Sequence, residues 1–390
     1  MKRNIYLAYF LAAMKNSWFF LGVWVLYYLK FTNYAGIGLI ETVMIVTTSA
    51  GEIPTGAVAD LLGKKKTLIL AFFFEAFGGF IMAFAQNFSQ LIFSVFVMCI
   101  GGVMYSGTLD ALIFDSLKQK NLENKYDKVI ANISSIVLIT IASVSIIGGL
   151  MYTINPRLPF LANAIAYVIG LIASLFLIEP SIDTIKFSFK NYLFQTRQGF
   201  KQLFASVSRH QTIKLLLLGG VLVVLDEMME AFLLVEFGFK AKGLGIIYSV
   251  IYLLSAFSSQ ISPWFKQKFS FGFGLLILSL IIAASLIISS VAGLVLGGLM
   301  VLLRYNLAPI FNNLSSVMIN QNTLSKYRVT TISTFNMLKN LPYVLSAFFI
   351  GRLMDIISAK MFAFYFGSAL LVVIVIQFSV SYFFSSARRQ

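Results

Sequence analysis

Three acidic side chains inside one long apolar stretch are the first candidates for chemistry in this sequence. Asp226, Glu227 and Glu230 fall within the stretch 213–237. On a helix of about 3.6 residues per turn, Asp226 and Glu230 share one face, while Glu227 is turned about 100° away. Two close carboxylates in a medium of low dielectric constant cannot both ionise cheaply, so one should hold a proton. The spacing therefore predicts a proton-coupling site.

Charged residues also interrupt other apolar stretches. Lys15 and Arg304 lie about halfway along theirs, and Asp110 lies in a third. Ionisable side chains inside a membrane are costly and usually serve transport or pair with one another. We therefore place these three residues with Asp226, Glu227 and Glu230 in a proton- and substrate-coupling set. The alternative is that the acidic pair forms a structural salt bridge to Lys15, Arg304 or Lys339.

The composition shows which elements must position these residues. Of 390 residues, 59% are hydrophobic and 12% are charged, against about 25% charged in soluble domains. Apolar runs of about 20 residues cross a bilayer as helices, and the alternation of barrel strands is absent. The sequence predicts an all-α polytopic membrane protein with about twelve transmembrane helices. The predicted spans are 5–30, 36–60, 67–87, 90–117, 130–153, 158–179, 213–237, 243–264, 272–292, 294–320, 329–350 and 361–385.

The connections between these spans predict the orientation and the domains. Most Lys and Arg residues fall on alternate connections, which by the positive-inside rule places both termini in the cytoplasm and the protein in the cell membrane. The only long polar connection, 180–212, is predicted to be an amphipathic linker on the inner leaflet. It separates an N-terminal bundle of six helices, 1–179, from a C-terminal bundle of six helices, 213–390.

Several function classes fit the sequence poorly. The net charge of +15 is spread over short clusters between apolar runs, whereas a nucleic-acid binder gathers its cations on one solvated face. One cysteine, Cys99, and one histidine, His210, are too few for a metal centre or thiol chemistry. The segment GAVADLLGKKKT departs from a phosphate-binding loop, because Lys65 stands where Ser or Thr is required. We expect no enzyme, no cofactor, no metal and no nucleic-acid partner.

A family resemblance enters at the connection between the second and third spans. GEIPTGAVADLLGKKKTLIL at 51–70 resembles the signature loop of the major facilitator superfamily. SGTLDALIFDSLK at 106–118 and RLPFLANAIAYVIG at 157–170 resemble the fourth and sixth helices of bacterial exporter-like members. The resemblance assigns a gating role to the loop. Its key positions here are Gly56, Asp60, Gly63, Lys64 and Lys65.

The resemblance implies two six-helix bundles around a central cavity that opens alternately to each side, with helices one, four, seven and ten lining it. The sequence also departs from the family's pattern. Residues 93–105 lack the arginine that many proton-coupled members carry in the fourth helix. SVSIIGG at 143–149 keeps Gly148 and Gly149 of the antiporter motif but has Val144 and Ser145 where Gly and Pro would stand.

These observations favour a secondary active transporter that exports a small lipophilic or cationic molecule in exchange for protons. The expected partners are the small-molecule substrate, protons and the lipid bilayer, and the protein is expected to be a monomer. Two alternatives stay open: solute uptake by proton symport, and a membrane scaffold or sensor that transports nothing.

Overall fold

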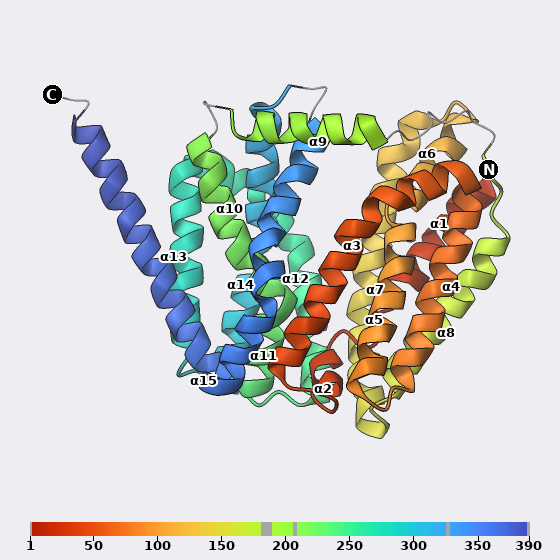
Figure 1. Cartoon of the computed structure of the whole chain (residues 1–390), viewed down its shortest axis with the longest axis horizontal. Helices are drawn as coiled ribbons and strands as arrows, with labels where there is room; N and C mark the ends of the chain where they lie inside the picture. The colour runs from red at the N-terminus through yellow and green to blue at the C-terminus, as the bar shows by residue number, and fades with distance from the viewer. Residues whose placement is uncertain (1, 181–188, 206–208, 325–327, 388–390) are drawn as a thin grey trace. The chain divides into compact units, whose positions relative to one another are not determined.

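The computed structural model describes residues 2–180, 189–205, 209–324 and 328–387, and its regular structure in those ranges is entirely helical (Figure 1). The chain forms two compact units. Unit 1 comprises Met1–Phe194 and Lys240–Leu253, and unit 2 comprises Gln195–Phe239 and Leu254–Gln390. Residues 181–188 and 206–208 of the predicted linker lie outside the described residues.

Unit 1 is built on a core of apolar side chains from its first, third, fourth and sixth predicted spans. Leu11, Phe72, Leu112 and Tyr167 are almost completely buried there. The third span packs against both the fourth and the sixth. The helices of this unit are α1 (Lys2–Lys15), α2 (Trp24–Tyr28), α3 (Tyr34–Leu62), α4 (Lys64–Ala83), α5 (Phe88–Tyr105), α6 (Thr108–Lys118), η1 (Glu123–Lys125), α7 (Tyr126–Ile154) and α8 (Leu158–Leu175).

Unit 2 contains a helix interrupted by a π-helical turn. This turn, η2 (Leu225–Met229), joins α10 (Arg209–Val224) to α11 (Glu230–Glu236). Ser358 has a φ of 68° and marks the join between two helices within α15 (Arg328–Ala387). The other helices of the unit are α13 (Phe271–Ser289) and α14 (Leu294–Gln321), while α9 (Phe189–Leu203) and α12 (Ala241–Lys268) are divided between the two units.

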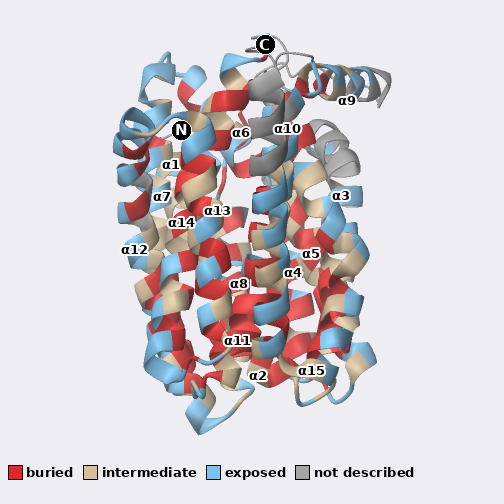
Figure 2. Ribbon diagram, turned by 90° about the vertical axis from the view of Figure 1, so that its left-hand side faces the viewer, coloured by how far each residue is buried: buried red, intermediate tan, exposed pale blue. Residues whose placement is uncertain are grey.

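The helices have the length and composition of membrane spans. Eight helices in the described part of the chain are long and apolar enough to cross a bilayer. Exposed positions run the whole length of the helices in Figure 2, and many of them carry large apolar side chains, among them Phe257, Leu345 and Ile356. Such a surface suits lipid, and the chain is an all-α multi-pass membrane protein. Twelve crossings remain a prediction.

The first predicted span, 5–30, differs from the expectation of one continuous helix. Its helix α1 ends at Lys15, and the chain turns irregularly until α2 begins at Trp24. The Asn16 and Ser17 side chains donate to carbonyl oxygens of the last turns of α1, at 2.9 and 2.8 Å. A side chain at Gly148 of α7 would overlap the Phe19 carbonyl oxygen in this break. Close packing against α7 therefore covers irregular backbone that lipid could not satisfy.

Candidate functional site

The charged residues predicted for the second half meet in one cluster of unit 2, in which Glu230 and Arg304 are buried. Arg304 of α14 donates from Nε and Nη2 to the two carboxylate oxygens of Glu230, the first residue of α11, at 2.5 and 2.7 Å. Its Nη1 donates to Ser289 and Ser285 of α13, at 2.9 and 3.3 Å. Both charged residues are 1% exposed. A bidentate pair with its remaining donor satisfied is the arrangement that makes a buried charge tolerable.

Asp226 and Glu227 have a different environment in the π-helical turn. Asp226 is exposed and Glu227 half-buried, although they precede the buried Glu230 by only one turn. The Tyr305 hydroxyl donates a hydrogen bond to Asp226, and Lys339 of α15 interacts electrostatically with both carboxylates. A π turn inserts an extra residue into a helix and occurs frequently at functional sites. No sequence pattern that we used predicts it.

A small pocket joins these residues. Its lining includes Asp226, Glu230, Arg304 and Tyr305, and its volume of about 10 Å³ is room for about one water molecule. The structure thus brings together four of the six residues predicted to couple protons and substrate, because Glu227 lies in the same turn as Asp226. With Lys339, the cluster holds three carboxylates, those of Asp226, Glu227 and Glu230, and two cations, Arg304 and Lys339. Arg304 neutralises Glu230, so the surplus acid is at Asp226 and Glu227.

Lys15 lies in unit 1 and pairs with an acidic residue of the same unit. Its Nζ is 2.7 Å from Oε1 of Glu75 in α4, and Glu75 is 3% exposed. The ammonium also lies 5.6 to 5.9 Å from the ring centres of Trp18, Tyr105 and Tyr167. Such rings attract a cation through their quadrupoles. Within unit 1, the partner of Lys15 is therefore Glu75.

An open cavity of about 330 Å³ borders this pair. Lys15, Asn16 and Tyr105 line one part of it, and Asp110 of α6 lines another. Asp110 is exposed. The remaining two predicted coupling residues, Lys15 and Asp110, therefore share one cavity whose polar groups carry both signs of charge. A small polar or charged solute suits such a lining.

The predicted gating loop is described in part. Gly63 has a φ of 89°, a conformation that L side chains rarely adopt, and a Cβ there would lie 2.9 Å from the Glu179 carboxylate. That carboxylate accepts from the backbone N–H groups of Lys64 and Lys65, at 2.8 and 2.7 Å, and so caps α4. Lys64 Nζ also lies 2.6 Å from Asp115. The surroundings of Gly56 and the side chain of Asp60, both in α3, lie outside the described residues.

Sequence reasoning missed several partners of the charged residues. It did not identify Tyr305, the serine pair at 285 and 289, or the capping role of Glu179. The four-residue spacing of Ser285 and Ser289 on α13 was a usable signal, because it places both hydroxyls on one face. Among the described residues, no group of three or more His, Cys, Asp or Glu side chains is arranged to hold a metal ion.

Solved structures share this fold. The crystal structure of the nucleoside transporter NupG matches with a TM-score of 0.79 and 15% identity, over 97% of this chain and 98% of that one. The structure of a POT family transporter in complex with 5-aminolevulinic acid matches with a TM-score of 0.71 and 14% identity, over 97% and 96%. At such identities the likeness concerns the fold alone.

Sequence comparison gives the family. An uncharacterized MFS-type transporter, YxaM of Bacillus subtilis (strain 168), is 21% identical over 235 residues, which are 58% of this chain. The chain spans 57% of the length of that relative. The family model of the Major Facilitator Superfamily matches residues 5–346. A helical membrane fold with ionisable groups in its spans agrees with that match, and the chain belongs to the major facilitator superfamily.

Proposed function

We propose that this transporter exports a lipophilic, cationic small molecule across the cell membrane in exchange for protons, with Asp226 as the residue that carries the proton. The observation that carries the proposal is the contrast between two carboxylates of one pocket. Glu230 is buried in a bidentate pair with Arg304, whereas Asp226 is exposed beside it. A group that exchanges protons must be reachable, and Asp226 meets that requirement.

The coupling follows from the charge of one group. When Asp226 is ionised, its carboxylate attracts a cationic substrate, and Glu227 in the same turn adds to the attraction. When Asp226 takes up a proton, that attraction is lost and the substrate is released. Because proton and cation compete for one charge, each lowers the affinity of the other by the same factor. Alternating access to the two sides of the membrane then converts this competition into exchange.

The arrangement of Lys339 supports this role. A Cβ at Gly219 of α10 would lie 2.8 Å from the methylene carbons of Lys339, so the stem of this lysine lies against α10. Its ammonium interacts electrostatically with Asp226 and Glu227. Among the described residues, neither of these two acids forms a salt bridge. Such a cation is a counter-charge that an incoming substrate can displace.

Proton flux in proteoliposomes tests the proposal. The purified protein is reconstituted with a pH-sensitive dye inside, and tetraphenylphosphonium or ethidium is added as a probe cation. We expect a proton flux that depends on the probe in the wild type and its loss in Asp226→Asn. Asp127→Asn, an exposed aspartate at the start of α7, is the matched control and should keep the flux. Full flux in Asp226→Asn would contradict the assignment.

Uptake by proton symport is the second candidate. The cavity beside Lys15 and Asp110 carries both signs of charge, which suits a polar solute better than a lipophilic one. Two of the solved structures that share the fold are named for a nucleoside transporter and a POT family transporter. Nucleosides and dipeptides therefore belong in the same assay. A proton flux in the direction of the added solute, with none for the probe cations, would favour symport.

We also propose that both termini lie in the cytoplasm. The proposal predicts that a cysteine placed at Lys120 faces the cytoplasm and one placed at Asn155 faces the outside. Both positions are exposed. In a Cys99→Ser background, a membrane-impermeant maleimide added to intact cells should label the Asn155→Cys variant alone. Labelling of the Lys120→Cys variant alone would show that the protein has the opposite orientation in the membrane.

A further inference from the structure

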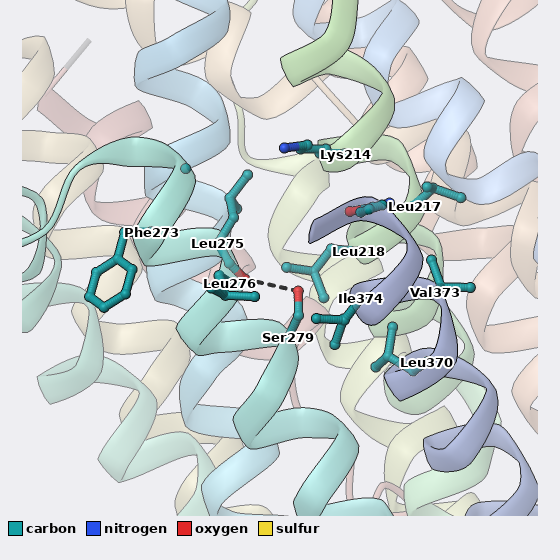
Figure 3. A pocket seen from close by; sticks show the side chains of 12 residues that line it. Lys214, Leu217, Leu218, Phe273, Leu275, Leu276, Ser279, Leu370, Val373 and Ile374 are labelled. Carbon is teal, nitrogen blue, oxygen red and sulfur yellow. Dashed lines mark hydrogen bonds between the residues drawn. The ribbon is translucent and has the colours of Figure 1, made fainter. Parts of the chain in front are cut away.

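We propose that a groove of unit 2 binds one anionic phospholipid, whose acyl chain lies between α10, α13 and α15 and whose phosphate contacts Lys214. The groove has a volume of about 290 Å³. Its lining is drawn in Figure 3, and it is separate from the pocket at Asp226. The lining residues are Lys214, Leu217, Leu218, Gly272, Phe273, Leu275, Leu276, Ser279, Leu370, Val373, Ile374 and Gln377.

The groove is a wedge between α13 and the C-terminal part of α15, and α10 forms its third wall. At its closed end α13 and α15 pack tightly, because a Cβ at Gly367 would lie 2.9 Å from the Ala283 carbonyl oxygen. Toward the C-terminus α15 leans away from α13 (Figure 1). From Gly367 to Gln377 the wedge is about 15 Å long at about 1.5 Å per residue. That is half of a hydrocarbon core about 30 Å thick, the depth of one leaflet.

The walls of the groove suit an acyl chain. Leu276, Leu218 and Ile374 come from three different helices and face one another in Figure 3. The Ser279 hydroxyl that also faces the groove donates to the Leu275 carbonyl oxygen of its own helix at 2.8 Å, so it does not require a polar ligand. A chain of methylene groups can fill this space without leaving a buried polar atom unpaired.

The charge at the open end suits an anionic head group. Lys214 lies at that end, its side chain is exposed, and it is the one charged residue of the lining. A lysine at the end of an apolar groove places its ammonium at the level of the lipid head groups. No carboxylate lines the groove to compete for that ammonium. A phospholipid with a net negative charge therefore satisfies both ends of the site.

Native mass spectrometry of the purified full chain tests the inference. The probes are phosphatidylglycerol and phosphatidylcholine of identical acyl chains, titrated separately. We expect one phosphatidylglycerol to be retained more tightly than phosphatidylcholine. Lys214→Gln should weaken phosphatidylglycerol binding about fivefold and leave phosphatidylcholine unchanged. Lys268→Gln is the matched control, because Lys268 is exposed at the end of α12 and lines no part of the groove.

A second pair of variants tests the acyl-chain part of the site. Ser279→Leu adds apolar bulk inside the groove and should lower the occupancy of both lipids, while Ser279→Ala keeps the space open and should not. Size-exclusion profiles confirm that all variants are folded. The inference is overturned if Lys268→Gln weakens binding as much as Lys214→Gln, if both lipids bind equally to the wild type, or if Ser279→Leu retains full occupancy.

Discussion

Arg304 binds Glu230 in a bidentate pair, in which Nε donates to one carboxylate oxygen and Nη2 donates to the other. Both residues are 1% exposed. The pair joins α14 to the first residue of α11, just after the π-helical turn. Two serines of α13 satisfy the last guanidinium nitrogen. This cluster therefore fixes three helices of unit 2 relative to one another.

Removal of one residue of the Glu230–Arg304 ion pair should destabilise the protein strongly. Glu230→Leu leaves the buried guanidinium without a counter-charge, and such losses cost about 3–5 kcal/mol. The double variant Glu230→Leu with Arg304→Met removes both charges and should recover most of that stability. The fraction of protein that stays monodisperse after heating in detergent measures the effect.

The same double variant separates structure from coupling. If Asp226 alone carries the proton, the folded double variant keeps proton flux with a probe cation. A folded double variant without flux would show that Glu230 takes part in coupling. Asp226→Asn is the stability control. It changes an exposed carboxylate, so this variant should unfold at the same temperature as the wild type.

The sequence predicted the chemical types at the site better than their pairing. Asp226 and Glu230 are four residues apart, a spacing that predicted one shared face, and both residues line one pocket. Nothing in the spacing distinguishes their environments. Their difference depends on the local π turn and on an arginine 74 residues away from Glu230, which are products of tertiary packing.

The long-range partner of Lys15 shows the same limit. The sequence indicated the acidic pair of the seventh predicted span as possible partners of Lys15. The structure pairs Lys15 with Glu75 inside unit 1. The apolar spans were predictable because each carries its own signal of about 20 residues, whereas an ion pair between two spans leaves no local pattern.

The ion pair of Lys15 and Glu75 should contribute to the stability of unit 1. Lys15→Met leaves Glu75 buried without its counter-charge, and we expect a loss of about 3 kcal/mol. Lys15→Arg should also destabilise, because a planar guanidinium does not replace a compact ammonium among three rings. A thiol-reactive dye can follow unfolding, since Cys99 is the only cysteine and is buried in α5.

The double variant Lys15→Met with Glu75→Leu is the control for this pair. It removes both charges and should melt within about 1 kcal/mol of the wild type. If Lys15→Met and the double variant melt at the same lowered temperature, the loss reflects packing of the lysine stem and not the unpaired carboxylate.

Glu179 should stabilise the start of α4. Its two oxygens accept from successive backbone N–H groups of that helix, and loss of such a cap typically costs about 1–2 kcal/mol. We expect Glu179→Ala to lower the melting temperature reported by Cys99. Lys120→Ala removes an exposed charge that caps no helix in the described part of the chain, and it should have no effect. An unchanged melting temperature in Glu179→Ala would show that the end of α4 is satisfied by other groups.

The break between α1 and α2 should depend on Gly148. Even a methyl group there would overlap the Phe19 carbonyl oxygen, so Gly148→Ala must displace either the break or α7, and overpacking of this kind costs about 1–3 kcal/mol. Gly272→Ala is the matched control, because nothing lies within 4 Å of a Cβ at that helical position, and it should be neutral or slightly stabilising. Equal melting temperatures for the two variants would mean that the break adjusts freely, in which case Gly148 does not determine its position.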